Sequence, residues 1–433
     1  MKIVQITPGA GGMFCGNCFR DNALVAALRK VGHDTIMVPL YLPIRLDEED
    51  QSAGTPIFFG GINVYLQEKS PIFRTAPKWL HDLLASPTLL KWAAGRSART
   101  RAADLGDLTI SMLRGEEGNQ ARELDELIAW LKEQPRPDII CLSNALLVGM
   151  ARKLKSALRA PVICFLQGED SFLDALPEPA RKTALDVLNA RAADVDLFIA
   201  PTRYFANRMV ERVGLAADRV RVVYNGINVE GFTPAAGAPE PPVLGYFARM
   251  CREKGLDTLV EAYILLKQRD TARNLRLLVG GGCGPSDEPF VNELRDKLQR
   301  AKLQDHVEFR PNLTRVEKLE FLRSLSVFSV PALYGEAFGL YIIEALAAGV
   351  PVVQPRHAAF PELIDATQGG LLVTPGDPKA LADGIETLLR DAILRGSFAD
   401  KGRKAVLRDF NSTAFAGRLL QEYEKVVSTT TRR

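Results

Sequence analysis

Two glutamates, Glu336 and Glu344, are separated by seven residues and stand where a loop turns into a helix. An apolar run at 328–331 is typical of a strand, and a helix is expected to open near Gly339. The N-terminus of such a helix offers unpaired N–H groups and a positive dipole end, which suit a pyrophosphate. A carboxylate there could instead accept ribose hydroxyls. The alternative is that both glutamates only cap and charge the helix.

A pair of cations, Arg249 and Lys254, lies between another strand-like run, 243–247, and another helical pattern. Two cations at the end of a strand could neutralise a departing diphosphate, arginine through its fork of donors and lysine as a point charge. The alternative is an exposed basic turn, because Arg252 and Glu253 stand between them.

A glycine-rich turn at 8–12 follows the first apolar run of the chain. Glycines such as Gly11 and Gly12 let backbone amides approach a phosphate or a sugar closely. On its own this is a weak signal, because any tight turn uses glycine.

Two further carboxylates, Glu169 and Asp170, follow the apolar run at 162–166. Either could serve a substrate hydroxyl as a base or as a hydrogen-bond partner. The alternative is that they cap the next helix.

The cysteines could be read as a metal or redox site. Cys15-Gly-Asn-Cys18 has a suitable spacing, but no second closely spaced pair follows it. Cys141 and Cys164 could complete a four-thiolate cluster. Packing as small apolar side chains is the alternative that the sequence favours.

One Asp-x-Asp sequence, Asp194-Val-Asp196, has the spacing of a metal-binding turn. It precedes the strand-like run at 197–201, and ligands of such folds bind at the opposite, carboxyl ends of the strands. We therefore expect no metal and no other cofactor.

The elements that must position these residues are apolar runs of strand length that alternate with helical patterns. The expected strands are 3–7, 34–39, 138–142, 162–166, 197–201 and 220–224, then 243–247, 275–279, 307–309, 327–330 and 352–354. Several are apolar without alternation, as parallel strands covered on both faces are. The pattern predicts an α/β protein with two Rossmann-like, doubly wound domains that face a cleft holding the active site.

The join between the domains is expected in the proline- and glycine-rich stretch 233–242. Residues 1–234 would form the N-terminal domain and 235–412 the C-terminal domain. The N-terminal domain carries a helical, basic excursion at 74–133. Its first part, 74–103, has six cations, one acid and two tryptophans. Such a helix can lie in a membrane interface; the alternative is packing on its own domain.

Composition excludes several classes of protein. The net charge of +3 in 433 residues is too small to indicate nucleic-acid binding. No apolar stretch reaches the ~20 residues of a membrane span. The apolar start runs into Thr7-Pro8-Gly9 too early for a signal peptide, whose apolar region needs roughly 7–15 residues. We expect a cytoplasmic protein, peripheral on the inner membrane surface if 74–103 lies in the interface.

Together these motifs resemble the large retaining glycosyltransferase family four, which has the two-domain GT-B architecture. The resemblance covers nearly the whole chain. The matching motifs are Glu-x7-Glu at Glu336 and Glu344, Arg-x4-Lys at Arg249 and Lys254, the interdomain signature at 224–228 with 232–234, the glycine loop at Gly11 and Gly12, and the turn Gly32-His33-Asp34.

The resemblance implies roles for these residues. Glu344 would hold the donor ribose, Glu336 would contact the sugar, and Arg249 with Lys254 would stabilise the leaving diphosphate. Backbone amides would bind phosphate or sugar oxygens at Phe338, Gly339, Leu340 and Tyr341. A last helix at 413–433 would cross back onto the N-terminal domain.

The implied reaction is metal-independent transfer of a sugar from a nucleotide-diphosphate sugar to a glycan, lipid or small-molecule acceptor. Same-face attack by the acceptor would retain the anomeric configuration. One departure concerns the acceptor: many members have a histidine in the loop that holds Glu169 and Asp170, and none stands there in this chain. The alternatives are a non-catalytic nucleotide-sugar-binding regulatory or partner subunit, and an epimerase of the same fold.

Overall fold

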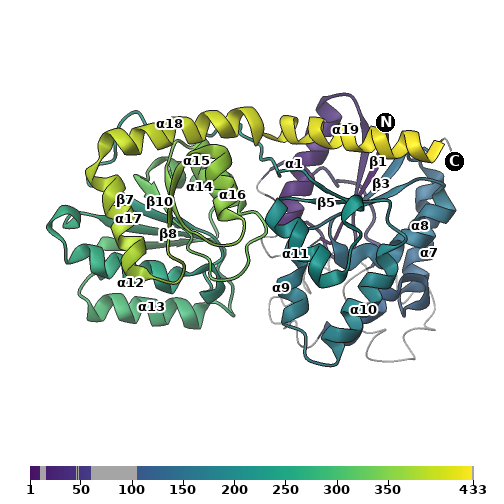
Figure 1. Ribbon diagram of the computed structural model, residues 1–433, viewed down its shortest axis with the longest axis horizontal. Helices are drawn as coiled ribbons and strands as arrows, with labels where there is room; N and C mark the ends of the chain where they lie inside the picture. Colours follow the sequence, from purple (N-terminus) through teal and green to yellow (C-terminus); the bar gives the residue numbers. More distant parts are fainter. Residues whose placement is uncertain (10–15, 45, 47, 60–104, 432–433) are drawn as a thin grey trace. The chain divides into compact units, whose positions relative to one another are not determined.

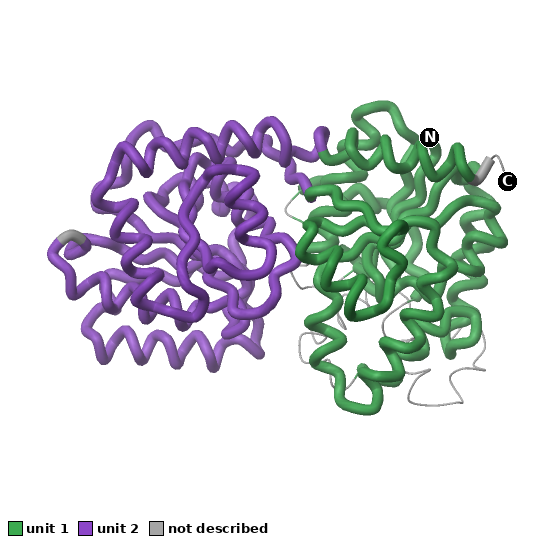
Figure 2. Tube along the Cα trace, viewed as in Figure 1, with its two compact units in different colours: residues 1–224, 415–433 green, residues 225–414 purple. Residues whose placement is uncertain are grey.

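The computed structural model describes residues 1–9, 16–44, 46, 48–59 and 105–431 (Figure 1). Gly11, Gly12, Cys15 and the segment 74–103 lie outside the described residues. The chain divides into two compact units, unit 1 (1–224 with 415–433) and unit 2 (225–414), as Figure 2 shows. The division comes at 224, whereas the sequence places the join in the loop after it.

Unit 1 is built on a six-stranded parallel sheet in the order β2-β1-β3-β4-β5-β6. Its strands are β1 (Lys2–Thr7), β2 (Asp34–Pro39), β3 (Ile139–Leu142), β4 (Val162–Phe165), β5 (Leu197–Ala200) and β6 (Val220–Val222). Its helices are α1 (Gly16–Lys30), α6 (Gly106–Arg114), α7 (Ala121–Glu133), α8 (Ala151–Leu158), α9 (Glu169–Asp174), α10 (Ala180–Ala192), α11 (Arg203–Val213) and, from residue 415, α19 (Ser412–Thr431).

The last helix completes the core of unit 1. Phe415, Leu419 and Tyr423 recur at the spacing of one helix face and are fully buried. They belong to the cluster that holds Leu24 of α1 and Ile163 of β4. The C-terminal segment of the chain is therefore part of the N-terminal fold.

Unit 2 also has a six-stranded parallel sheet, in the order β12-β11-β10-β7-β8-β9. Its strands are β7 (Val243–Phe247), β8 (Arg276–Gly281), β9 (Val307–Pro311), β10 (Val327–Phe328), β11 (Val352–Pro355) and β12 (Gly370–Val373). Its helices are α12 (Leu256–Lys267), α13 (Glu288–Arg300), α14 (Arg315–Arg323), α15 (Leu340–Ala347), α16 (Phe360–Thr367), α17 (Pro378–Arg390) and α18 (Ala392–Asp409).

The two parallel sheets with alternating helices confirm the predicted α/β class with Rossmann-like domains. Counted from β7, the strands of unit 2 follow the 3-2-1-4-5-6 order of dinucleotide-binding folds. Among the described residues, no helix is long and apolar enough to cross a membrane.

The edge strand β12 was not expected from the sequence. It begins in the pair Gly369-Gly370, which reads as a turn, and its later residues are only half-buried. Gly370 is required by close packing, because a Cβ there would come within 2.0 Å of the Val352 carbonyl oxygen. Gly370 therefore marks the contact of β12 with β11 rather than a break in the sheet.

The strand order of unit 2 reverses between β7 and β10, which are hydrogen-bonded neighbours. The loops that follow these two strands leave from the same place, and open α/β sheets bind ligands at such a switch point. The two loops also touch: Leu333 N donates to Glu253 O at 3.0 Å. Gly255 permits this approach, because its φ is +71° and a Cβ would lie 1.9 Å from Pro331 O.

Candidate active site

The two loops of the switch point bring Lys254 and Glu336 together. Lys254 follows β7, Glu336 follows β10, and the Lys254 ammonium donates to Glu336 Oε2 at 2.6 Å. Their side chains are 20% and 12% exposed, so the pair is shielded but reachable from solvent. Lys254 and Glu336 are 82 residues apart in the sequence, and their ion pair joins the two motifs to which they belong.

Two tyrosines complete this cluster. The hydroxyls of Tyr334 and Tyr341 both donate to Glu336 Oε2, at 2.7 and 2.9 Å. Lys254 also contacts the Tyr334 hydroxyl, and its ammonium lies 4.8 and 5.2 Å from the two ring centroids. We call Lys254, Glu336, Tyr334 and Tyr341 the carboxylate cluster.

The carboxylate cluster keeps Glu336 ionised. Burial alone would raise the pKa of Glu336, but the Lys254 charge and the hydrogen bonds from Lys254, Tyr334 and Tyr341 hold it below the ordinary value. Burial, followed by the Glu336 charge, raises the pKa of both tyrosines well above the usual range. At neutral pH the cluster therefore contains an anion that accepts three hydrogen bonds on one oxygen.

Arg249, also in the loop after β7, is held by a buried acid. Arg249 Nε and Nη2 donate to Asp287 at 2.8–3.2 Å in a two-pronged ion pair. Asp287 is fixed by the Gly284 amide at 3.0 Å. The Arg249 side chain is 60% exposed and that of Asp287 only 7%. The guanidinium is thus anchored on one side and open to solvent on the other.

Glu344 lies in the second turn of α15 and pairs with a lysine from the neighbouring helix α14. Lys318 Nζ donates to Glu344 Oε1 at 3.1 Å, and the two side chains are 11% and 18% exposed. Helix α15 begins at Leu340, directly after Gly339, whose φ is +94°. Phe338 is buried and packs near Phe410. The four residues expected to offer amides therefore form the entry to this helix.

In unit 1, the candidate carboxylate Glu169 is bound by backbone amides and, among the residues that the structure describes, by no basic side chain. Both oxygens of Glu169 accept backbone N–H groups, from Ala145 at 2.7 Å, Gln167 at 2.8 Å and Gly168 at 3.0 Å. The residue is 4% exposed, and burial raises its pKa despite these hydrogen bonds. Glu169 ties the loop after β4 to the loop after β3, an arrangement that suits a structural brace better than a base.

Asp170, next to it, is ion-paired. Its carboxylate is 2% exposed and contacts Arg208 of α11. Glu169 and Asp170 thus lie at the carboxyl end of the sheet, but each has a protein partner. Their role toward an acceptor stays a prediction.

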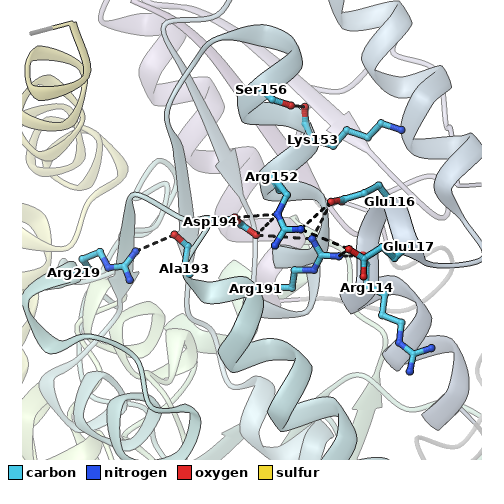
Figure 3. Close-up of polar contacts among 10 residues, drawn as sticks. All are labelled: Arg114, Glu116, Glu117, Arg152, Lys153, Ser156, Arg191, Ala193, Asp194 and Arg219. Carbon is cyan, nitrogen blue, oxygen red and sulfur yellow. Dashed lines mark hydrogen bonds and ion pairs between the residues drawn. The ribbon is translucent and has the colours of Figure 1, made fainter. Parts of the chain in front are cut away.

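Both aspartates of the Asp-x-Asp sequence form ion pairs with basic side chains, as Figure 3 shows for Asp194. Asp194 accepts from Arg152 Nε at 3.1 Å and lies 3.9 Å from Arg191. Asp196 accepts from Lys155 at 2.6 Å and from the Val162 amide at 2.9 Å. Among the described residues, no group of three or more His, Cys, Asp or Glu side chains could hold a metal.

The cysteines that the structure describes form no disulfide with one another. Cys18, Cys141 and Cys164 are buried. Burial raises the pKa of Cys141 to about 12 and that of Cys164 well above its ordinary value. Protonated thiols are poor metal ligands, which favours apolar packing over the thiolate cluster.

Three residues of the site were not found from the sequence: Asp287, Lys318 and Tyr334. Asp287 follows the glycine-rich turn after β8, so the strand order, once known, would have pointed to it. Tyr334 precedes Glu336 by two residues, in a loop whose conformation cannot be predicted from a sequence pattern. Lys318 is one charged residue on an ordinary helix, and no sequence signal distinguishes it.

Comparison with known proteins gives matches along most of the described chain. Residues 107–230 match the family described as Glycosyltransferase Family 4, and residues 233–405 match Glycosyl transferases group 1. Together these two matches span more than half of the chain.

Curated relatives include a phosphatidyl-myo-inositol mannosyltransferase of Mycobacterium leprae, 32% identical over 49% of this chain and 55% of its own length. A D-inositol 3-phosphate glycosyltransferase of Streptomyces scabiei is 33% identical over 48% of this chain and 49% of its own. The chain thus spans about half the length of the curated relatives it matches.

Solved structures show the same fold. Sucrose-phosphate synthase from Thermosynechococcus elongatus has a TM-score of 0.72 at 21% identity, covering 99% of this chain and all of its own. HepE of Anabaena, solved in complex with UDP, has a TM-score of 0.68 at 17% identity over 98% of this chain and 100% of its own. At these identities the likeness concerns the fold, which is GT-B in both. With the two family matches, the chain belongs to the group 1, family four glycosyltransferases.

Proposed function

We propose that this protein is a retaining glycosyltransferase that moves a sugar from a nucleotide-diphosphate sugar to an acceptor. The observation that carries the proposal is the carboxylate cluster, in which the Arg-x4-Lys and Glu-x7-Glu motifs meet at the switch point of unit 2. A chain of this family that had lost its activity would have no need to keep an ionised glutamate under three donors.

The donor would bind along the carboxyl edge of unit 2. Arg249 and Lys254 supply two cations for the diphosphate, and the amides at the start of α15 supply N–H groups and the positive dipole end. Glu344, in the second turn of that helix, would accept ribose hydroxyls. The binding of UDP by HepE, a protein of the same fold, supports a nucleoside diphosphate as the ligand class.

The chemistry follows from where charge develops. As the glycosidic phosphate bond breaks, negative charge grows on the diphosphate and positive charge on the sugar ring. Lys254 and the helix amides would stabilise the first, and the Glu336 anion would stabilise the second. Three donors crowd Glu336 Oε2 and weaken it as a nucleophile. We therefore propose same-face attack by the acceptor without a covalent intermediate, which a trapped glycosyl-Glu336 adduct would contradict.

Metal independence is part of the proposal. Arg249 and Lys254 place fixed positive charge where other transferases use a divalent cation. The protein is expected to keep its full turnover rate in EDTA. A rate that requires added magnesium would overturn this point.

The acceptor stays open in chemical class: a glycan, a lipid or a small molecule. Inositol-containing acceptors belong to the curated relatives by name and are first candidates for an assay. Contact with an inner membrane surface through 74–103, in a protein expected to be cytoplasmic, is tested by sedimentation with anionic vesicles at low salt. Absence of co-sedimentation would remove that prediction.

The test of the proposed function is thermal stabilisation by a panel of nucleoside diphosphates and nucleotide sugars, with EDTA and then with magnesium. A ligand at a hundred times its Kd stabilises the folded state by about 2.7 kcal/mol. One diphosphate should raise Tm selectively, and Lys254→Ala should lose the shift. Release of nucleoside diphosphate from the matching sugar donor would separate an enzyme from a regulatory subunit. No shift with any nucleotide would overturn the proposal.

A further inference from the structure

The ion pair between Lys318 and Glu344 joins two helices of unit 2. Lys318 is the fourth residue of α14 and Glu344 the fifth of α15. Lys318 as a whole residue is 8% exposed, which is rare for lysine unless its charge is paired. Its ammonium donates a hydrogen bond to Glu344 Oε1 at 3.1 Å. The other carboxylate oxygen makes no hydrogen bond to the described residues and is the one available to a ligand.

The position of Lys318 is fixed by the way α14 begins. Thr314 caps this helix in a capping box with Glu317, which satisfies two backbone N–H groups and sets the direction of the first turn. Arg315 anchors the same turn by donating to Glu230 O at 2.9 Å. One turn after the cap, Lys318 N donates to Thr314 O at 2.8 Å. The ammonium therefore reaches Glu344 from a helix end that is held at several points.

Glu344 needs such a partner for an electrostatic reason. Its carboxylate is mostly shielded from water and lies on the helix whose amino end is proposed to meet the diphosphate. An unpaired anion there would repel the diphosphate, and poor solvation would favour rotation of the side chain toward water. A carboxylate displaced in this way could not accept hydrogen bonds from ribose hydroxyls bound at the start of α15.

We infer that Lys318 is a positioning residue for donor recognition, which holds the Glu344 carboxylate oriented so that its other oxygen accepts the hydroxyls of the nucleotide ribose. The inference rests on the proposed function. It assigns Lys318 a part in telling ribonucleotides from deoxyribonucleotides, through Glu344 and without contact with the substrate.

The experiment measures the preference of the full chain for UDP over 2′,3′-dideoxy-UDP, and for GDP over its dideoxy form, by equilibrium binding. We compare Lys318→Met, which keeps the apolar stem, Lys318→Arg, which keeps the charge, and Glu344→Gln. The matched control is Arg323→Met, an exposed cation in the last turn of the same helix. Tm reports folding for each variant.

The wild type should prefer the ribose form by on the order of tenfold, the usual effect of a hydrogen bond to a charged group. Lys318→Met should remove most of this preference, raise KM for the donor and leave kcat nearly unchanged. Lys318→Arg should restore the preference, and Arg323→Met should keep it. Lys318→Met should add little to Glu344→Gln in the double variant, because both act on one interaction.

Two results overturn the inference in different ways. If Glu344→Gln loses the ribose preference while a folded Lys318→Met keeps it, Lys318 is only a link between helices and the proposed function stands. If the wild type binds neither UDP, GDP nor any other nucleoside diphosphate of the panel, the proposed function itself fails. Should Lys318→Met not fold, Lys318→Gln is measured in the same way, since it keeps a hydrogen-bond donor and removes the charge.

Discussion

The two units place acidic residues at the same edge of similar parallel sheets and use them in opposite ways. In unit 2, Glu336, Glu344 and Asp287 pair with lysine or arginine side chains that are partly open to solvent. In unit 1 the contrast is Glu169, which is closed off by three backbone amides; its neighbour Asp170 pairs with an arginine, Arg208, as Asp287 does in unit 2. One edge keeps ions within reach of a ligand, whereas the other uses a carboxylate to hold its own loops.

The partners of a carboxylate indicate whether it is available to a ligand. A cation that still reaches solvent beside its protein partner, as Lys254 and Arg249 do with side chains 20% and 60% exposed, can contact a substrate anion as well. A carboxylate that satisfies buried N–H groups cannot leave them without a penalty for each unpaired group. Position at the carboxyl edge of a sheet is therefore weaker evidence for catalysis than the kind of partner found there.

The strongest test of the comparison is Lys254→Ala. Removing the cation at the diphosphate should lower kcat/KM by about a hundredfold or more, as removal of a preorganised charge at a reaction centre does. Steady-state kinetics with the selected donor measures this. The matched control is Arg252→Ala, in the same loop, whose pairs with Asp257 and Glu293 are exposed. An equal loss in Arg252→Ala would show that the loop as a whole, and not Lys254, matters.

In unit 1 the expected effect is on stability. Glu169→Ala leaves three backbone N–H groups without acceptors and should cost roughly 2–4 kcal/mol of unfolding free energy. Urea denaturation measures this, with Glu178→Ala as the control because its pair with Arg181 is exposed. Donor turnover per folded molecule should stay near that of the wild type. A variant that keeps its stability and loses transfer to the acceptor would make Glu169 the acceptor-side base instead.

Asp287→Asn should have a smaller effect, on donor binding. Asparagine keeps the shape but weakens the hold on Arg249, and a lost charge-assisted pair of this kind should reduce donor affinity by on the order of tenfold. The fold should survive, because Arg249 is exposed on its other side. Isothermal titration with the nucleoside diphosphate checks this, against Asp296→Asn on the exposed face of α13. Unchanged affinity would mean that Arg249 needs no anchor.

The same contrast explains which parts of the fold and of the candidate site could be predicted from the sequence. The strands of both sheets could be predicted because buried parallel strands are short apolar runs, and β12 was missed because its glycines imitate a turn. Glu336 and Lys254 were assigned to one site from separate motifs. Asp287, the partner of Arg249, and Lys318, the partner of Glu344, could not be predicted, since an ion pair between distant segments leaves no mark in either one. Tyr334 could not be predicted because the conformation of its loop has no sequence pattern. Whether Glu169 is a base, a hydrogen-bond partner or a helix cap could not be decided from the sequence, because its three amide donors are backbone groups, which have no sequence signature.

The pH dependence of stability should also separate the two edges, in opposite directions. The pKa of Glu336 is lower in the folded state than in the unfolded chain, so its contribution is present above the unfolded pKa of about 4.5 and is lost as pH falls through the folded value. The pKa of Glu169 is raised by burial, so its contribution is complete below the unfolded pKa and is lost as pH rises through the folded value. Unfolding free energies from urea titrations of the wild type, Glu336→Gln and Glu169→Gln, from roughly one pH unit below the unfolded pKa to about neutral pH, measure both. The difference between the wild type and Glu336→Gln should shrink toward acid, and that for Glu169→Gln should grow. Parallel curves would mean that both carboxylates experience the same surroundings, and the contrast between the two edges would then fail.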